Sequence, residues 1–241
     1  MADPLLAAKA AAARAAVDRY VRPGSRLALG TGTTAEEAVR ALRALHPTAT
    51  FDCVASSAAT ERLASSLGLA VRPLRGDDRF DLMIDGADEV TPQLDLTKGR
   101  GGALLREKLL ARLADRLVIV VDESKLVTAI GERAPIPVEV VPYCRPVLER
   151  SLAREGFAVA VRRVARETFR TENGNEVLDL TPAAPVREPA EVARRLRSHV
   201  GVVETGLFVG IAERAVVGSP SGGVRELLPK PTATGRDPRR G

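Results

Sequence analysis

The stretch RLALGTGTTAEEAVRAL, residues 26–42, decides the fold of this chain. Arg26–Leu29 is a short apolar run that predicts a strand, and Ala35–Leu45 has the apolar spacing of a helix. The loop between them, Gly30–Thr34, contains only glycine and threonine. A strand that passes directly into a helix through such a loop predicts one unit of a parallel α/β sheet.

The same alternation of strands and helices continues outward from this unit. The predicted strands are Thr50–Ala55, Ala70–Pro73, Phe80–Ile84 and Leu117–Val121, and the predicted helices are Pro4–Tyr20, Ala58–Leu67 and Ala103–Ala114. Strands that alternate with helices of this length indicate a parallel sheet covered on both faces. We therefore expect a Rossmann-like parallel sheet domain of the α/β class over residues 1–130.

The pattern changes after Gly131. The expected elements are strand Val138–Val141, helix Arg145–Arg154, strands Ala158–Val164 and Glu176–Leu180, helix Ala190–His199 and strand Val202–Phe208. This β-α-β-β-α-β order is the split pattern of a ferredoxin-like module. It predicts a small α+β domain inserted at residues 131–205, with residues 206–228 returning to the first sheet. The Pro-, Gly- and Arg-rich segment 229–241 is expected to be a disordered tail.

Composition and charge narrow the function classes. The chain has 241 residues, of which 45% are hydrophobic and 28% charged, as in ordinary globular proteins. It has no apolar run long enough to cross a membrane, and Lys9 and Arg14 interrupt its Ala-rich start, so neither a membrane span nor a secretory signal is expected. The two cysteines, Cys53 and Cys144, suit neither a disulfide framework nor a zinc site. A cytoplasmic protein without a metal is therefore expected.

The net charge of +5 does not by itself indicate nucleic acid as a partner. Lys and Arg are scattered rather than grouped in a stripe, and only 3% of the residues are aromatic, which leaves few side chains for stacking on bases. A basic surface also attracts phosphorylated metabolites. A small anionic substrate is therefore favoured over nucleic acid.

Three polar or Gly-rich loops follow predicted strands, at the sheet edge where ligands of parallel α/β sheets bind. The first loop, Gly30–Thr34, combines threonine hydroxyls with the unpaired N–H groups of a helix start, which suits a phosphate. An ordinary threonine cap on the helix is the alternative. A dinucleotide-binding loop would require an acidic residue at the end of the next strand, where Ser56 and Ser57 stand, so no nicotinamide cofactor is expected.

The second loop is DGADE, residues 85–89. Its three carboxylates repel one another, so a metal, a cationic side chain or hydrogen bonds to sugar hydroxyls must compensate them. An Asx-turn that caps a following helix is the alternative. Neither His46 nor His199 is close in sequence to these carboxylates, and no metal site is predicted.

The third loop opens the stretch KGRGGALLREK, residues 98–108. Successive glycines can present a nest of N–H groups to an oxyanion, and Lys98 adds a cation at its edge. Glu107 falls on the early turns of the following helix, where a solvated helix residue is the alternative to a functional carboxylate. Lys125, another of only five lysines, follows a further predicted strand.

Four segments in this order, GTGTTAEEAV (30–39), DGADEV (85–90), KGRGGALLREK (98–108) and DESK (122–125), resemble ribose-5-phosphate isomerase, type A. PVEVVP (137–142), the NGN at 173–175 and GVVETGLF (201–208) match the small domain of the same family. The resemblance covers nearly all of residues 4–228. It implies an aldose–ketose isomerase of the pentose phosphate pathway that interconverts D-ribose 5-phosphate and D-ribulose 5-phosphate through an enediol. It also implies a homodimer or homotetramer that needs no cofactor.

The resemblance also implies a role for each matching residue. Glu107 would be the general base, and Asp85, Asp88 and Lys98 would assist ring opening and proton movement between the two sugar oxygens. The implied phosphate contacts are Thr31, Gly32, Thr33, Thr34 and Lys125, with Lys9 as a further candidate, and the other implied substrate contacts are Gly86, Ala87, Gly99, Arg100 and Gly101. This chain has Arg100 where the family usually has glycine, and Thr33 where it usually has serine. Arg100 fits only if its side chain points away from the oxyanion.

Two other functions remain open at this point. A non-catalytic sugar-phosphate-sensing module would share the sheet and the phosphate loop, but would normally carry a helix-turn-helix segment, for which the 25 residues before the first strand are too few. A CoA-transferase-like enzyme would use a glutamate as nucleophile. An isomerase assay with ribose 5-phosphate distinguishes all three.

Overall fold

The computed structural model describes residues 4–230, and its largest sheet has six strands in the order β15-β14-β6-β3-β1-β2. These strands are β1 (Arg26–Leu29), β2 (Asp52–Ala55), β3 (Leu82–Asp85), β6 (Leu117–Asp122), β14 (Arg214–Gly218) and β15 (Val224–Leu227). All neighbouring strands are parallel except β14 and β15, which are antiparallel. The predicted Rossmann-like α/β sheet is confirmed, including the return of the chain to it after the small α+β segment.

Alternate residues of the central strands pack against different helices. Leu27 and Leu29 of β1 belong to a cluster with helices α1 (Pro4–Tyr20) and α2 (Thr33–Leu45), whereas Ala28 belongs to a second cluster with α4 (Leu104–Leu113). Successive side chains of a strand point to opposite faces, so the sheet is covered on both sides. Helix α3 (Ala58–Ser66) contributes Ala64 to the first cluster.

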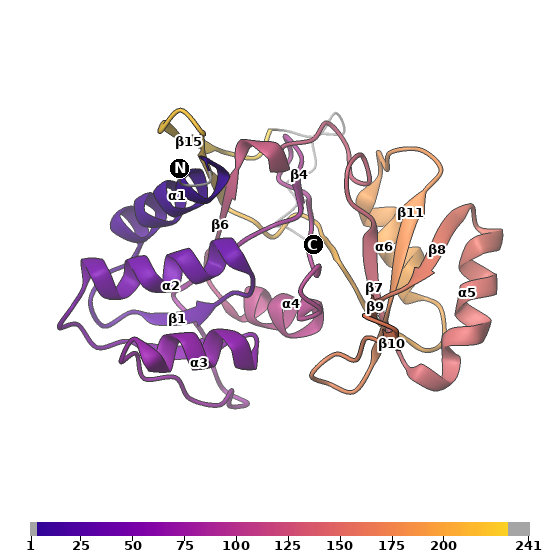
Figure 1. Ribbon diagram of the computed structural model, residues 1–241, viewed down its shortest axis with the longest axis horizontal. Helices are drawn as coiled ribbons and strands as arrows, with labels where there is room; N and C mark the ends of the chain where they lie inside the picture. Colours follow the sequence, from indigo (N-terminus) through magenta and orange to yellow (C-terminus); the bar gives the residue numbers. More distant parts are fainter. Residues whose placement is uncertain (1–3, 231–241) are drawn as a thin grey trace.

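The second lobe contains a four-stranded antiparallel sheet in the order β12-β7-β11-β8. Its elements are β7 (Ile136–Val140), α5 (Arg145–Arg154), β8 (Phe157–Val161), β11 (Glu176–Pro182), α6 (Pro189–Arg197) and β12 (Val202–Thr205). Leu148, Leu152 and Leu196 of the two helices form its core with the inner face of the sheet. Figure 1 shows this lobe on the right, with α4 between it and α2. The division into domains at 1–130, 131–205 and 206–228 stays a prediction.

Several short elements complete the chain. A three-stranded antiparallel sheet joins β4 (Glu89–Val90), β5 (Leu96–Thr97) and β13 (Leu207–Phe208), and a hairpin joins β9 (Arg163–Val164) and β10 (Glu167–Thr168). Two short 3₁₀ helices are η1 (Glu123–Lys125) and η2 (Pro142–Cys144). Strands of two residues carry too little periodicity to be predicted from sequence.

Three predicted strands are wrong in extent. Ala70–Pro73 forms only a single bridge, at Val71, since Pro73 has no N–H to donate to a neighbouring strand. The strand predicted over 158–164 ends at Val161, after which the chain turns into the β9–β10 hairpin. The strand predicted over 202–208 is divided at Gly206, where a Cβ atom would lie 2.2 Å from the Lys98 carbonyl oxygen, and its halves join different sheets.

Most of the tail predicted to be disordered, 229–241, lies outside the described residues. Within the described part, Lys230 has no regular secondary structure, and its backbone N–H donates to the Pro92 carbonyl at 2.9 Å. None of the helices in residues 4–230 has the length and apolar character that crossing a bilayer requires.

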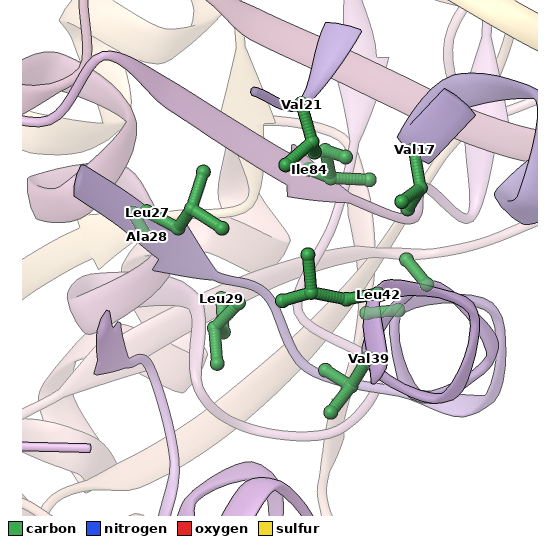
Figure 2. Close-up of a pocket in the computed structure, with 10 residues that line it drawn as sticks. Val17, Val21, Leu27, Ala28, Leu29, Val39, Leu42 and Ile84 are labelled. Carbon is green, nitrogen blue, oxygen red and sulfur yellow. The ribbon is translucent and has the colours of Figure 1, made fainter. Parts of the chain in front are cut away.

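A small void lies in the core between α1, α2 and the central sheet (Figure 2). Its volume is about 10 Å³, and only aliphatic side chains line it, among them Val17, Leu29, Leu42 and Ile84. A space of this size holds at most about one water molecule, and none of the side chains that line it can bind one by a hydrogen bond. It is a packing defect of the core and not a ligand site.

Candidate active site

The first loop joins β1 to α2. Helix α2 begins at Thr33, after Gly32 with a φ of +104°, and no side chain caps its N-terminus. The threonine-cap alternative is therefore wrong, and the first N–H groups of this helix are available to an anion. Lys9 of α1 reaches this loop, because its Nζ lies 3.4 Å from Thr33 Oγ1. Thr33 is exposed, whereas Thr34 is buried.

Thr31 faces a cluster of hydroxyl groups at the end of β2. Its Oγ1 lies 2.6 Å from Ser56 Oγ and donates to Ser57 Oγ at 2.9 Å, and Thr60 Oγ1 donates to the Gly30 carbonyl at 2.9 Å. The Thr31 backbone N–H donates to Asp85 Oδ1 at 3.2 Å. The hydroxyl and the N–H of Thr31 are therefore both engaged within the protein. The cluster fixes the loop at the sheet edge.

Asp85 ends β3 and is fully buried. Its Oδ1 also accepts the Gly86 N–H at 2.7 Å. A Cβ atom on Gly30 would lie 2.1 Å from this oxygen, so only glycine fits beside the carboxylate. No helix follows Asp85, because the chain continues into β4; the expected alternative of a helix cap is wrong.

The other two carboxylates of the second loop point in different directions. Asp88 Oδ2 accepts the Arg100 N–H at 3.1 Å and thereby joins the second loop to the third. Glu89 is buried and accepts the N–H groups of Gly131 at 2.7 Å and Arg133 at 2.6 Å. Glu89 therefore anchors the connection to the second lobe, and the predicted repulsion among three neighbouring carboxylates is avoided.

Lys98 brings the second and third loops together. Its Nζ lies 2.8 Å from Asp85 Oδ2 and 3.3 Å from Glu107 Oε1, and it donates to the Gly86 carbonyl at 2.8 Å. Burial alone lowers the pKa of Lys98, but the carboxylates of Asp85 and Glu107 together raise it more strongly, so the pKa lies above the ordinary lysine value. Lys98 therefore favours the ammonium form and lies between two carboxyl groups.

Glu107 lies in the first turn of α4 and is 3% exposed, so the alternative of a solvated helix residue is wrong. Burial raises its pKa to about 8, Lys98 opposes this shift, and the charge of Asp85 adds to it. Burial likewise raises the pKa of Asp85 above its ordinary value, against the effect of Lys98. Among the described residues, Glu107 Oε2 has no hydrogen-bond partner. A carboxylate with a free oxygen and a pKa near neutrality can accept a proton from a bound molecule.

The third loop turns sharply at Gly99–Gly102, where the Gly102 N–H donates to the Gly99 carbonyl at 3.0 Å. Gly99 and Gly102 have φ values of +105° and +81°, which side chains rarely adopt. Gly101 lies against the first loop, since a Cβ atom there would be 3.5 Å from Thr31 Cγ2. Arg100 is exposed, as its place in this turn requires.

The remaining predicted contacts lie on the same edge of the sheet. Gly86 packs against Thr34, since a Cβ atom on Gly86 would lie 3.6 Å from Thr34 Cβ. Ala87, the next residue, is partly buried. Asp122 Oδ1 accepts the Ser124 N–H at 2.9 Å, which shapes the turn that ends at Lys125. Lys125 is partly exposed, and within residues 4–230 its ammonium makes no ion pair or hydrogen bond.

Both the sequence and the fold that carry these loops match those of known proteins. A family model described as ribose 5-phosphate isomerase A (phosphoriboisomerase A) matches residues 52–222, well over half of the chain.

The chain belongs to this family.

Relatives named ribose-5-phosphate isomerase A match nearly the whole chain. The protein of Thermomicrobium roseum is 46% identical over 218 residues, which cover 89% of this chain and 91% of the relative. The protein of Deinococcus radiodurans is 43% identical, with 86% and 92% covered. The solved ribose 5-phosphate isomerase of Plasmodium falciparum has a TM-score of 0.90 at 32% identity and covers 94% of this chain and all of that one. A D-ribose-5-phosphate isomerase in complex with phospho-erythronic acid has a TM-score of 0.88 at 30% identity, with 93% and 99% covered.

Some residues of this site were not expected from the sequence. Ser56, Ser57 and Thr60 support the first loop, and the only sequence signal for them is their position after the second parallel strand. Arg162 contacts the third loop from the second lobe, and nothing in the sequence distinguishes it from the many other arginines. In the described part of the chain, no three His, Cys, Asp or Glu side chains are grouped in a way that could hold a metal.

Proposed function

We propose that this member of the ribose-5-phosphate isomerase A family interconverts D-ribose 5-phosphate and D-ribulose 5-phosphate through an enediol, with Glu107 as the base. The observation that carries the proposal is the free Oε2 of the buried Glu107 beside a lysine held by Asp85. A related isomerase solved with phospho-erythronic acid, a phosphorylated sugar acid, supports the choice of substrate class. The alternatives of a sensing module and a CoA-transferase-like enzyme are not favoured.

The first step takes the hydrogen from C2 of the open-chain aldose. Glu107 accepts it as a proton, the C–H electrons form the C1–C2 double bond, and negative charge develops on O1. A positioned base is worth about 100- to 10,000-fold in rate. The buried Lys98 lies 3.3 Å from Glu107 and stabilises the developing oxyanion by its positive charge.

The second step reverses the first at the neighbouring carbon. A proton moves from O2 to O1, assisted by Asp85 or Asp88, and Glu107 returns its proton to C1 while the C2 carbonyl forms. Glu107 and Lys98 end in the protonation states in which they began. The hydrogen has moved as a proton, so the proposed reaction needs no redox cofactor, and Lys98 supplies the positive charge that a metal would otherwise supply.

The proposal places the phosphate at the N-terminus of α2. The uncapped N–H groups of this helix, Thr33, Lys9 and Lys125 would contact it. Phosphate lies away from the reacting carbons, and its binding orients the sugar for the reaction.

Replacing Lys125 with alanine is expected to raise KM about tenfold or more and to change kcat little, because charge-assisted hydrogen bonds contribute about 1.5–3 kcal/mol. Lys230→Ala is the control, since Lys230 is an exposed lysine that, like Lys125, lies near a strand end. Steady-state kinetics with ribose 5-phosphate measures both constants. An unchanged KM in Lys125→Ala removes this residue from the phosphate site.

The rate is expected to depend on pH through Glu107. Since Glu107 acts as a base only when ionised, and burial raises its pKa to about 8, kcat/KM should rise with pH and level off above about pH 8. The charge of Asp85 adds to this pKa, so Asp85→Asn should move the rise to lower pH. The control Asp81→Asn, at a half-exposed aspartate paired with Arg26, should not. A pH–rate profile of the three proteins checks the shift. A pH–rate profile of Asp85→Asn that coincides with that of the wild type contradicts the effect of Asp85 on the pKa of Glu107.

The direct test of the function is an isomerase assay with ribose 5-phosphate. Ribulose 5-phosphate should form without added cofactor; a protein that binds the sugar phosphate without turnover would be a sensing module. A covalent thioester at Glu107 with a CoA substrate would identify a transferase. An isomerase of this kind belongs to the pentose phosphate pathway.

A cytoplasmic location and an assembly as homodimer or homotetramer are also part of the proposal. Light scattering on the purified chain measures its mass against 25.6 kDa for one copy. Fractionation of cells tests the location; one relative, from Arabidopsis thaliana, is named as chloroplastic.

A further inference from the structure

Arg162 holds two successive carbonyl groups of the Gly-rich turn. It follows β8 in the second lobe, and its Nη1 donates to the carbonyls of Gly99 at 2.6 Å and Arg100 at 3.0 Å. Asp179 binds the other nitrogens of the guanidinium. Its Oδ2 accepts a hydrogen bond from Nε at 2.9 Å, and its Oδ1 accepts a shorter one from Nη2. The Arg162 side chain is only 13% exposed. One largely buried, oriented cation therefore fixes two neighbouring peptide groups beside the candidate active site.

The direction of these carbonyls determines the direction of the N–H groups. In a planar trans peptide, the C=O and the N–H point opposite ways. The peptide that contains the Gly99 carbonyl shows this, because its N–H, on Arg100, donates to Asp88 Oδ2 at 3.1 Å. By the same geometry, the N–H of Gly101 points away from Arg162. Among the described residues this N–H has no acceptor, and Gly101 itself lies against Thr31 of the first loop.

We propose that Arg162 is a positioning residue of the isomerase site: it holds the turn so that the Gly101 N–H is free to donate to the oxyanion of the reacting sugar. This inference rests on the proposed function. Arg162 acts through the backbone of the turn and does not touch substrate. Removing a single oxyanion donor typically lowers kcat about 100- to 1000-fold.

The arginine side chain is suited to this task in a way that lysine is not. Its planar fork reaches both carbonyls with one nitrogen while two other nitrogens bind Asp179. A lysine ammonium has no rigid fork and cannot keep all these contacts. Phe169, from the same lobe, adds a second support, because it packs where a side chain on Gly102 would lie.

The test compares Arg162→Ala and Arg162→Lys with the control Arg163→Ala in the full chain. Arg163 is the next residue and is exposed, and within residues 4–230 its guanidinium donates only to the Arg166 carbonyl. In Arg162→Ala, kcat should fall at least about tenfold while KM changes less than about threefold, because the lost donor acts on charge that develops in the transition state. Free guanidinium ion should restore part of kcat in Arg162→Ala and none in the control. Arg162→Lys should show a smaller loss of the same kind.

Amide hydrogen exchange supplies a readout that does not depend on turnover. Residues 99–102 should exchange faster in both Arg162 variants, and the strands of the central sheet should be unchanged. The inference is overturned if kcat is retained in either variant, if guanidinium does not restore it, or if exchange rises throughout the chain. If the wild-type protein has no isomerase activity, the proposed function itself is overturned. That result does not depend on the amide hydrogen exchange of residues 99–102.

Discussion

Glu107→Gln is expected to lower kcat at least about a hundredfold, and up to about 10,000-fold, because the amide cannot accept the proton from C2. The glutamine has the shape of the glutamate and can keep an oxygen near Lys98, which lies 3.3 Å from Glu107 Oε1. Binding of ribose 5-phosphate should therefore be preserved. Steady-state turnover and a direct binding titration measure the two effects separately.

Glu213→Gln is the control for this substitution. Glu213 is a partly buried glutamate, paired with Arg116 at 2.7 Å, and takes no part in the candidate site. It should lose little turnover. Near-normal turnover in Glu107→Gln, or an equal loss in Glu213→Gln, removes Glu107 from its role as the base.

Lys98→Met is expected to impair both activity and stability. Loss of the ammonium removes the charge that faces the oxyanion, which typically costs about 3–4 kcal/mol of transition-state stabilisation, or about 100- to 1000-fold in kcat. It also leaves Asp85 and Glu107 buried without a cation, and removing one partner of a buried ion pair costs about 3–5 kcal/mol. Denaturant unfolding and turnover assays of the same preparation measure the two losses.

The stability loss in Lys98→Met should depend on pH in a defined direction. Without Lys98, the pKa values of Asp85 and Glu107 rise further, so folding keeps its stability at low pH, where both carboxyl groups are protonated, and loses it as pH rises. The double variant Lys98→Met/Asp85→Asn should regain stability but not turnover. Lys230→Met, at an exposed lysine, should change neither. A loss of stability in Lys98→Met that does not change with pH contradicts the account that Asp85 and Glu107 are buried beside Lys98.

The central sheet could be predicted because its strands are buried on both faces. The run from Leu117 to Val121 is apolar throughout, and the acidic residue Asp122 marks its end. The strand predicted at Ala70–Pro73 is reduced to a single bridge at Val71, because Pro73 has no N–H with which to extend the pairing. The strand predicted over 202–208 is divided at Gly206 because of the close approach of Lys98, which lies far away in the sequence.

The three loops were predicted on one edge of the sheet, and the structure places Asp85, Lys98 and Glu107 in one cluster there. What a sequence pattern does not contain is the pairing of distant segments. Arg162 contacts Gly99 across 63 positions, and Glu89 leaves the acidic loop to bind the backbone of Gly131 and Arg133. Such contacts depend on how the two lobes meet.

The most direct test follows hydrogen exchange between the sugar phosphate and heavy water by nuclear magnetic resonance. Wild-type protein should introduce solvent deuterium at C2 of ribose 5-phosphate or at C1 of ribulose 5-phosphate, since Glu107 holds the transferred hydrogen as a proton between the two steps. Glu107→Gln should lose this exchange by at least about a hundredfold, in parallel with turnover, and Glu213→Gln should retain it. Exchange at the wild-type rate in Glu107→Gln would show that another group carries the proton.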